Sequence, residues 1–196
     1  SLIEAYLSAE DKNFYEHGGV DYLGMIRGGV RSILARLRNP DAPLQSGSTI
    51  TQQVAKNFLF TAEQRIERKV REIVIARRME RAFTKDQILE LYLNEIYLGN
   101  RAYGVAAAAL NYFDKSLDEL ELHEAAYLAA LPKAPNNYHP TRRTEAAIGR
   151  RNYVLARMAA NGYITRATAE DYMAEPLETV ERLEGDRKST RLNSSH

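Results

Sequence analysis

The chain has 196 residues, of which 44% are hydrophobic and 27% charged, and its formal net charge is +1. These proportions are typical of a globular domain with one sizeable core. The near-neutral charge argues against nucleic acid as a partner. The absence of cysteine excludes disulfide bonds and thiolate metal sites. The longest uninterrupted apolar runs, 105–110 and 125–131, are too short to span a bilayer.

The C-terminal segment 186–196 differs from the rest of the chain because it has no periodicity and only one core-forming residue, Leu192. It matches the conceptual translation of a common sequencing adapter, so we interpret it as a disordered assembly artefact. The segment holds three basic residues and one acidic residue, so residues 1–185 have a net charge of −1. We expect one domain over 1–185. Because the chain opens inside a helical pattern, we also expect a fragment of a longer protein.

The N-terminal stretch contains the first candidate for chemistry, Glu10. Apolar residues recur at helical spacing before it: Leu2, Ile3, Tyr6 and Leu7. Glu10 falls in the middle of this apolar face, where lost hydration would raise its pKa and make it a better proton acceptor. Asp11 adds a like charge that acts in the same direction. Glu10 is therefore a candidate general base, with a helix cap or an ion pair as the alternative. Gly18 and Gly19 are expected to end this element.

Helical periodicity continues through the chain, and alternating strand patterns are essentially missing, so the expected fold is all-α. Further helices are predicted over 21–37, 85–98, 104–112, 120–131, 142–158 and 165–175. Four capping-box patterns predict helix starts: Thr49 with Gln52, Thr61 with Gln64, Thr84 with Gln87, and Ser116 with Glu119. The stretch 120–131 is apolar nearly all round, which predicts a central buried helix.

Two of the helices carry polar surfaces that a simple bundle does not need. After Thr49, one side is apolar, and the other bears a row of donors that ends in a cation: Thr49, Gln52, Gln53 and Lys56, with Asn57 beside it. Such a row is suited to sugar hydroxyls and a phosphate, with a solvated face as the alternative.

The next helix has an apolar side with Ile66, Val70, Ile73 and Val74, and a charged side with Arg65, Arg68, Lys69 and Glu72. The charged side continues as Ala76, Met79 and Phe83, so we expect protein to cover that end and the charges to border a cleft. Simple surface ion pairs are the alternative. Lys133 follows in a rigid turn between two prolines.

Five motifs occur in a recognisable order: Glu10-Asp11-x-x-Phe14-x-x-His17-x-Gly19, Gly47-Ser48-Thr49-Ile50-Thr51-Gln52-Gln53-x-x-Lys56-Asn57, Arg68-Lys69-x-x-Glu72, Lys85-x-x-Ile88-Leu89-x-x-Tyr92-Leu93-Asn94, and Gly104-Val105 through Tyr112-Phe113. With them, the stretch 2–175 resembles the peptidoglycan glycosyltransferase domain (glycosyltransferase family 51) of class A penicillin-binding proteins. The likeness is closest to the one-A type of Gram-negative bacteria.

The resemblance implies a lysozyme-like fold with a large helical lobe and a small membrane-facing jaw around a cleft. It also implies that lipid II is polymerised, with inversion, into β-1,4-linked glycan and that undecaprenyl pyrophosphate is released. Glu10 resembles the base that deprotonates the acceptor sugar. Glu72 resembles a second glutamate that organises the pyrophosphate or a divalent metal ion, Mg²⁺ or Mn²⁺; no organic cofactor is expected. Further residues resemble the substrate-binding set: Asp11, Thr49, Gln52, Gln53, Lys56, Asn57, Arg68, Lys69 and Lys133.

The family context also predicts where such a chain works. It implies a membrane anchor before Ser1, a place on the periplasmic face of the inner membrane, and a transpeptidase domain beyond this fragment. The sequence contains no Ser-x-x-Lys, Ser-x-Asn or Lys-Thr-Gly motif, so transpeptidase activity is not expected from this chain.

Two other functions are compatible with parts of the sequence. A lysozyme-like enzyme that cleaves glycans also uses a buried glutamate, but it has no need of the cations Lys56, Arg68 and Lys69. A non-catalytic helical module could bind nucleic acid through arginines of the 21–37 helix, and the net charge speaks against it.

Overall fold

The computed structural model describes residues 1–39, 47–59 and 65–180. Within these ranges the chain forms nine α-helices and one short 3-10 helix. The same ranges contain no β-strand, apart from an isolated bridge between Tyr97 and Tyr103. The prediction of an all-α fold is confirmed. The segment 186–196 lies outside the described residues.

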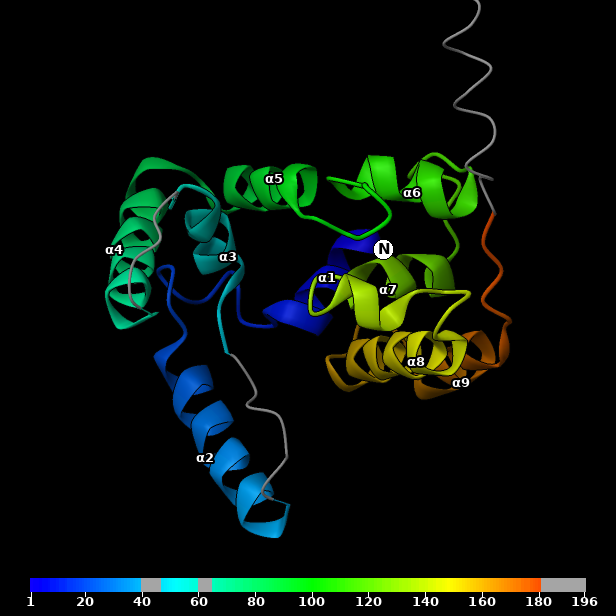
Figure 1. The fold of residues 1–196 in the computed structure, drawn as a ribbon, viewed down its shortest axis with the longest axis horizontal. Coiled ribbons are helices and arrows are strands. Elements are labelled where there is room, and N and C mark those ends of the chain that lie inside the picture. Colours follow the sequence, from blue (N-terminus) through cyan, green and yellow to red (C-terminus); the bar gives the residue numbers. More distant parts are fainter. Residues whose placement is uncertain (40–46, 60–64, 181–196) are drawn as a thin grey trace, which may run out of the picture.

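The helices form a larger group of α1, α7, α8 and α9 and a smaller group of α3, α4 and α5 (Figure 1). Their bounds are α1 Leu2–Glu10, α2 Tyr22–Arg38, α3 Ile50–Asn57, α4 Arg65–Ala82, α5 Lys85–Glu95, α6 Val105–Phe113, α7 Leu122–Ala130, η1 Pro135–Tyr138, α8 Thr144–Ala160 and α9 Arg166–Ala174. Helix α7 packs against α1 and α8, and α8 packs against α9. Helix α3 packs against α4 and α5. Helix α2 projects away from the others (Figure 1).

Helix α7 is the centre of the larger group, as predicted for the stretch 120–131. Every residue from Glu124 to Ala130 is buried, and alanines let the neighbouring helices approach closely. The Tyr6 hydroxyl of α1 donates a hydrogen bond to the Leu128 carbonyl at 3.0 Å. Tyr127 meets the ring of Tyr112 edge to face, with 5.6 Å between centroids. The first contact fixes α1, and with it the residue at its C-terminal end, and the second joins α7 to α6.

The first helix is shorter than the sequence predicts, because it ends at Glu10 rather than near Gly18. The next residue, Asp11, is non-helical, with φ −157° and ψ 76°. Its carboxylate accepts hydrogen bonds from the Ile50 amide at 3.0 Å and from His17 Nε2 at 2.9 Å. These partners lie outside the helix, so the chain leaves helical geometry to reach them.

The capping boxes give a mixed outcome. Those at Thr49 and Thr84 are present and start α3 and α5 as predicted. The helix start predicted at Ser116 is wrong. Ser116 does bond to Glu119, with 2.8 Å between the amide nitrogen and Oε2, but these residues form a turn. The helix begins at Leu122, after its own capping box. The box at Thr61 lies outside the described residues.

Helix α9 is held to α8 by a buried cation. The Arg151 side chain is 0% exposed. It donates hydrogen bonds to the carbonyls of Glu175 at 2.8 Å and Met173 at 3.0 Å. Because the last carbonyls of a helix have no partner within it, Arg151 acts as the C-terminal cap of α9.

Replacement of this cap should destabilise the fold without touching the cleft described below. We expect Arg151→Ala to lower the free energy of unfolding by about 3 kcal/mol, because it removes a buried side chain and leaves two carbonyls at the end of α9 without their hydrogen bonds. Urea unfolding of the full chain measures the change. The matched control is Arg166→Ala, since that side chain is 91% exposed in its pair with Glu170 and its loss should leave the midpoint unchanged. Equal midpoints for both variants would contradict the cap.

Candidate active site

A cleft of about 640 Å³ opens between α1 and α8 on one side and α3 and α4 on the other. Glu10 and Glu72 both line it. It is strongly cationic, since five basic residues line it: Lys56, Arg68, Lys69, Lys133 and Arg150. Two groups of helices that flank a cleft are the arrangement that the resemblance implied.

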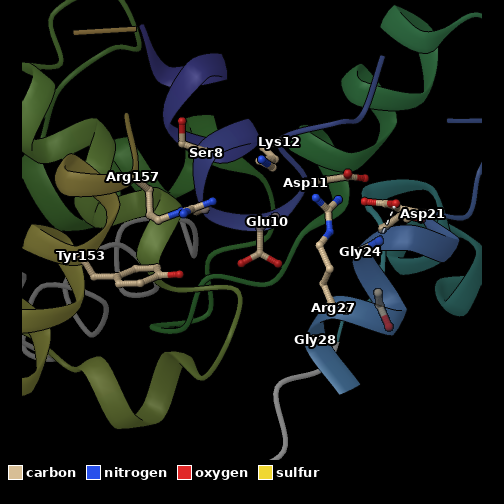
Figure 2. Close-up of a pocket in the computed structure, with 14 residues that line it drawn as sticks. Ser8, Glu10, Asp11, Lys12, Asp21, Gly24, Arg27, Gly28, Tyr153 and Arg157 are labelled. Carbon is tan, nitrogen blue, oxygen red and sulfur yellow. Dashed lines mark hydrogen bonds between the residues drawn. The ribbon is translucent and has the colours of Figure 1, made fainter. Parts of the chain in front are cut away.

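A second cavity of about 240 Å³ lies on the other side of Glu10, between α2 and α8. Glu10, Ser48 and Tyr153 line both cavities. Figure 2 shows the Glu10 carboxylate pointing into the space between Tyr153 of α8 and Arg27 of α2. One carboxylate therefore faces two compartments, each large enough for part of a ligand.

The surroundings of Glu10 are arranged to tune its acidity. Burial raises the pKa of Glu10 above its usual value, and the neighbouring charge of Asp11 acts in the same direction. Three groups oppose this rise without cancelling it: the hydrogen bond from Gln53 lowers the pKa most, followed by the charges of Arg150 and Lys133. Gln53 Nε2 donates to Glu10 Oε2 at 2.8 Å. Glu10 is thus a stronger proton acceptor than an exposed glutamate, and it is held in one orientation.

Loss of the Gln53 hydrogen bond should raise the pKa of Glu10 further. We expect Gln53→Leu to do so, because leucine fills similar space but cannot donate a hydrogen bond to the ionised carboxylate. A carbon-13 NMR titration of the Glu10 carboxyl measures the effect. Gln87→Leu, which removes an amide from the start of α5, is the control and should leave Glu10 unchanged. An unchanged pKa in Gln53→Leu would contradict the assignment.

The charged side of α4 meets the cleft, as expected. Lys69 Nζ donates to Glu72 Oε1 at 2.5 Å and to Ser48 Oγ at 2.8 Å. Glu72 is only 6% exposed, and the same face continues into the core with Ala76 and Met79. The side predicted to be apolar is the exposed one, because Val70 is 56% and Val74 45% exposed. The charged side is therefore the inner side of this helix.

Several residues that were predicted to bind substrate instead form hydrogen bonds within the protein. The Thr49 hydroxyl donates to the Gly19 carbonyl at 2.7 Å, and Gln52 Oε1 accepts from the Thr49 amide at 3.0 Å. Asp11 is occupied by the Ile50 amide and His17. Asn57, exposed at the end of α3, is absent from the described lining of both cavities. The roles of these four residues toward a substrate stay predictions.

Some lining residues were not predicted from the sequence. Arg150 and Tyr153 come from α8, and the guanidinium carbon of Arg150 lies 4.5 Å from the Tyr153 ring centroid. Ser48 and Pro132 also line the cleft. Arg150 and Tyr153 are three residues apart, so they share a helix face. That spacing could have linked them to each other, but not to a cleft formed with α1.

Comparison with known proteins agrees with this geometry. A family model described as transglycosylase matches residues 1–159. The chain belongs to the transglycosylase family. It is 50% identical to penicillin-binding protein 1A of Rickettsia typhi over 90% of this chain and 22% of that protein. It is 45% identical to penicillin-binding protein 1A of Escherichia coli over 90% of this chain and 20% of that protein. The chain thus spans about a fifth of the length of these relatives.

Membership of the transglycosylase family confirms the resemblance found in the five motifs. With it, the prediction of an all-α, lysozyme-like fold class is confirmed. The two glutamates that this resemblance singled out, Glu10 and Glu72, line the same cleft.

A buried carboxylate should lower the stability of the fold where it is ionised. The pKa of Glu10 is raised in the folded state, so the stability that its protonated form contributes is present at low pH. That stability is lost as the pH rises through the raised pKa. We therefore expect Glu10→Gln to melt at a higher temperature than the wild type at neutral pH. Well below 4.5, the ordinary pKa, the two should melt alike. Calorimetry across this range measures the difference, and a less stable variant at neutral pH would contradict it.

Proposed function

We propose that the chain is the peptidoglycan glycosyltransferase unit of a class A penicillin-binding protein. In this proposal it joins lipid II units into β-1,4-linked glycan and releases undecaprenyl pyrophosphate. The observation that carries the proposal is the position of Glu10, a buried carboxylate between two compartments of which one is lined by cations. A transfer between two large substrates needs this layout, and membership of the transglycosylase family supports it.

Glu10 acts as the general base in this reaction. A sugar 4-hydroxyl is a poor nucleophile at neutral pH, and a positioned base accelerates its attack by roughly 10²–10⁴-fold. The Glu10 carboxylate takes the hydroxyl proton while the oxygen forms a bond to the anomeric carbon of the donor. The bond from that carbon to the pyrophosphate oxygen breaks, and its electron pair leaves with the pyrophosphate. A single displacement of this kind turns the α-linked donor into a β-linked product.

The cationic cleft receives the donor. Negative charge grows on the departing pyrophosphate, and fixed cations already in place stabilise it without reorganising. Lys56 and Lys133 are exposed residues on its lining. The smaller cavity, with Arg27 and Arg157 on its lining, receives the acceptor. The growing glycan chain and lipid II are therefore the partners that the site is proposed to bind.

The proposal includes a divalent metal ion only as one bound by the Glu72 carboxylate. The described residues contain no group of three acidic or histidine side chains that could hold a metal ion. Mg²⁺ commonly binds through one or two carboxylates together with substrate phosphates, so Glu72 fits a site that the pyrophosphate completes. A bound ion would supply further neutralisation of the leaving group.

Helix α2 provides a surface for the membrane that contains the substrate's lipid tail. Seven of its apolar side chains are at least half exposed: Tyr22, Leu23, Ile26, Val30, Ile33, Leu34 and Leu37. An exposed apolar patch of this extent, on a helix that projects from the body (Figure 1), fits insertion into a lipid interface. Among the described residues, no helix is both long and apolar enough to cross a bilayer. We propose a place on the periplasmic face of the inner membrane, beside a transpeptidase domain in the longer protein.

The rival reading as a glycan-cleaving enzyme is less well supported. Hydrolysis of a neutral glycosidic bond also uses a buried glutamate, but it produces no pyrophosphate for five cations to stabilise.

The deciding experiment is polymerisation of lipid II in detergent by the full chain, with and without EDTA. We expect the wild type to form glycan and Glu10→Gln to form none, because glutamine keeps the shape but cannot accept the proton. Glu124→Gln is the control, since this buried carboxylate pairs with Lys115 away from both cavities. Polymerisation by a folded Glu10→Gln variant would overturn the role of the base. A folded wild type that cleaves glycan instead would overturn the function.

The cations should act on the chemical step. Truncation of one removes a charge-assisted contact, typically about 1.5–3 kcal/mol, which is roughly a 10- to 150-fold change. Because charge develops in the transition state, we expect Lys56→Ala and Lys133→Ala to lower kcat even at saturating lipid II. Their effects should be non-additive if both contact one pyrophosphate. Lys115→Ala is the matched control. A rise in KM alone, in both variants, would refute this role.

A further inference from the structure

A set of polar side chains beneath the site joins α3, α4 and α5. Glu80 of α4 accepts a hydrogen bond from the Thr51 hydroxyl of α3 at 2.6 Å. The same oxygen, Oε1, accepts from Lys85 Nζ of α5 at 2.8 Å. The Glu80 side chain is 9% exposed and that of Lys85 20%. None of these three residues is among the described lining of either cavity.

Lys85 extends this set to the segment that follows Glu10. Its Nζ donates to the His17 carbonyl at 2.6 Å and lies 4.4 Å from the ring centroid of Phe14. His17 Nε2 contacts the Asp11 carboxylate, which accepts from the Ile50 amide. Ile50 precedes Thr51, so the path returns to α3. We call this closed path, through Asp11, His17, Lys85, Glu80, Thr51 and Ile50, the polar ring.

The polar ring joins the two elements that meet at the catalytic base. Asp11 directly follows Glu10 at the end of α1, and Thr51 lies two residues before Gln53 on α3. The hydrogen bond between Gln53 and Glu10 spans the same two elements. Burial of a lysine and a glutamate is unfavourable unless both are paired, and paired ions often stabilise no more than apolar side chains would. Their directional bonds do, however, define one relative position of α3 and the 11–17 segment.

We propose that Glu80 is a positioning residue, which through Thr51 and Lys85 holds α3 so that Gln53 stays bonded to Glu10. Glu80 touches neither cavity, so it acts on the reaction only through these neighbours. The effect on the reaction rate rests on the function proposed above, whereas the effect on the protonation of Glu10 does not.

A looser α3 should alter the acidity of the base in a known direction. The Gln53 hydrogen bond lowers the pKa of Glu10, so its weakening raises that pKa. The other charged groups that face Glu10 come from α8, from the turn after α7 and from Asp11: Arg150 and Lys133 lower its pKa, and Asp11 raises it. Tyr6 and Tyr92 also face Glu10, with hydroxyls whose own pKa values are raised by burial.

The test uses two variants, of which one removes a hydrogen bond of the polar ring and the other removes the charge of Glu80. Thr51→Val keeps the branched shape but has no hydroxyl, and Glu80→Gln keeps the size but has no charge. The pKa of the Glu10 carboxyl is followed by carbon-13 NMR, and the pH dependence of lipid II polymerisation is followed in parallel. We expect the pKa to rise in both variants and the acid limb of the pH profile to move to higher pH. At neutral pH, kcat should fall about tenfold, with KM nearly unchanged. The double variant should be no worse than the more severe single one.

A matched ion pair elsewhere separates positioning from general stability. Lys115 and Glu124 join the turn after α6 to α7 at 2.8 Å, and the Glu124 side chain is also 9% exposed. Glu124→Gln should lower the melting temperature without moving the pKa of Glu10. Lys85→Arg, which keeps a donor for Glu80, should retain more activity than Lys85→Met.

A wild-type pKa for Glu10 in folded Thr51→Val and Glu80→Gln would overturn the proposal. If Glu80→Gln does not fold, Thr51→Val decides, since it changes a single hydroxyl. If the wild type fails to polymerise lipid II, the proposed function fails while the NMR titration still decides the positioning role.

Discussion

The site depends on the contact between the end of α1 and the start of α3, and the Asp11 carboxylate makes that contact. It binds the Ile50 amide, one of the donors that a helix leaves unpaired at its N-terminus, and it ends α1 directly after Glu10. Because a negative charge is favourable at a helix N-terminus, the same contact stabilises α3. The helix that carries Gln53 is therefore anchored beside Glu10, to which Gln53 donates a hydrogen bond.

This arrangement reconciles two opposed requirements on Glu10 in its proposed role as a base. A base must be desolvated enough to be a strong proton acceptor, yet it must be ionised before it can act. Burial meets the first requirement, while Gln53, Arg150 and Lys133 meet the second by stabilising the charged form. The cations face the same cleft, so groups proposed to receive the pyrophosphate also adjust the base.

The sequence was informative wherever local chemistry decides structure. The buried helix α7 and the starts of α3 and α5 could be predicted from local patterns, and the family motif drew attention to Glu10, which lines the cleft. The role of Glu10 as a base stays a prediction. One local signal misled, because the bond between Ser116 and Glu119 closes a turn rather than starting a helix. Where a long-range contact decides, prediction failed. Val70 and Val74 are apolar but exposed, because the charged face of α4 is needed at the cleft. Arg150 reaches the site only because α8 packs against α1, which no periodicity within α8 reveals.

The membrane contact proposed for the exposed apolar side chains of α2 would also change what concentration means for this chain. A helix that rests in a lipid interface confines the protein to the surface that holds a lipid-linked substrate. Encounters then take place in two dimensions and depend on molecules per unit area rather than per unit volume. Added detergent or lipid dilutes both reactants at that surface, even when their amounts in the tube stay the same. Under this proposal, an apparent KM for this chain is a property of the interface as much as of the cleft.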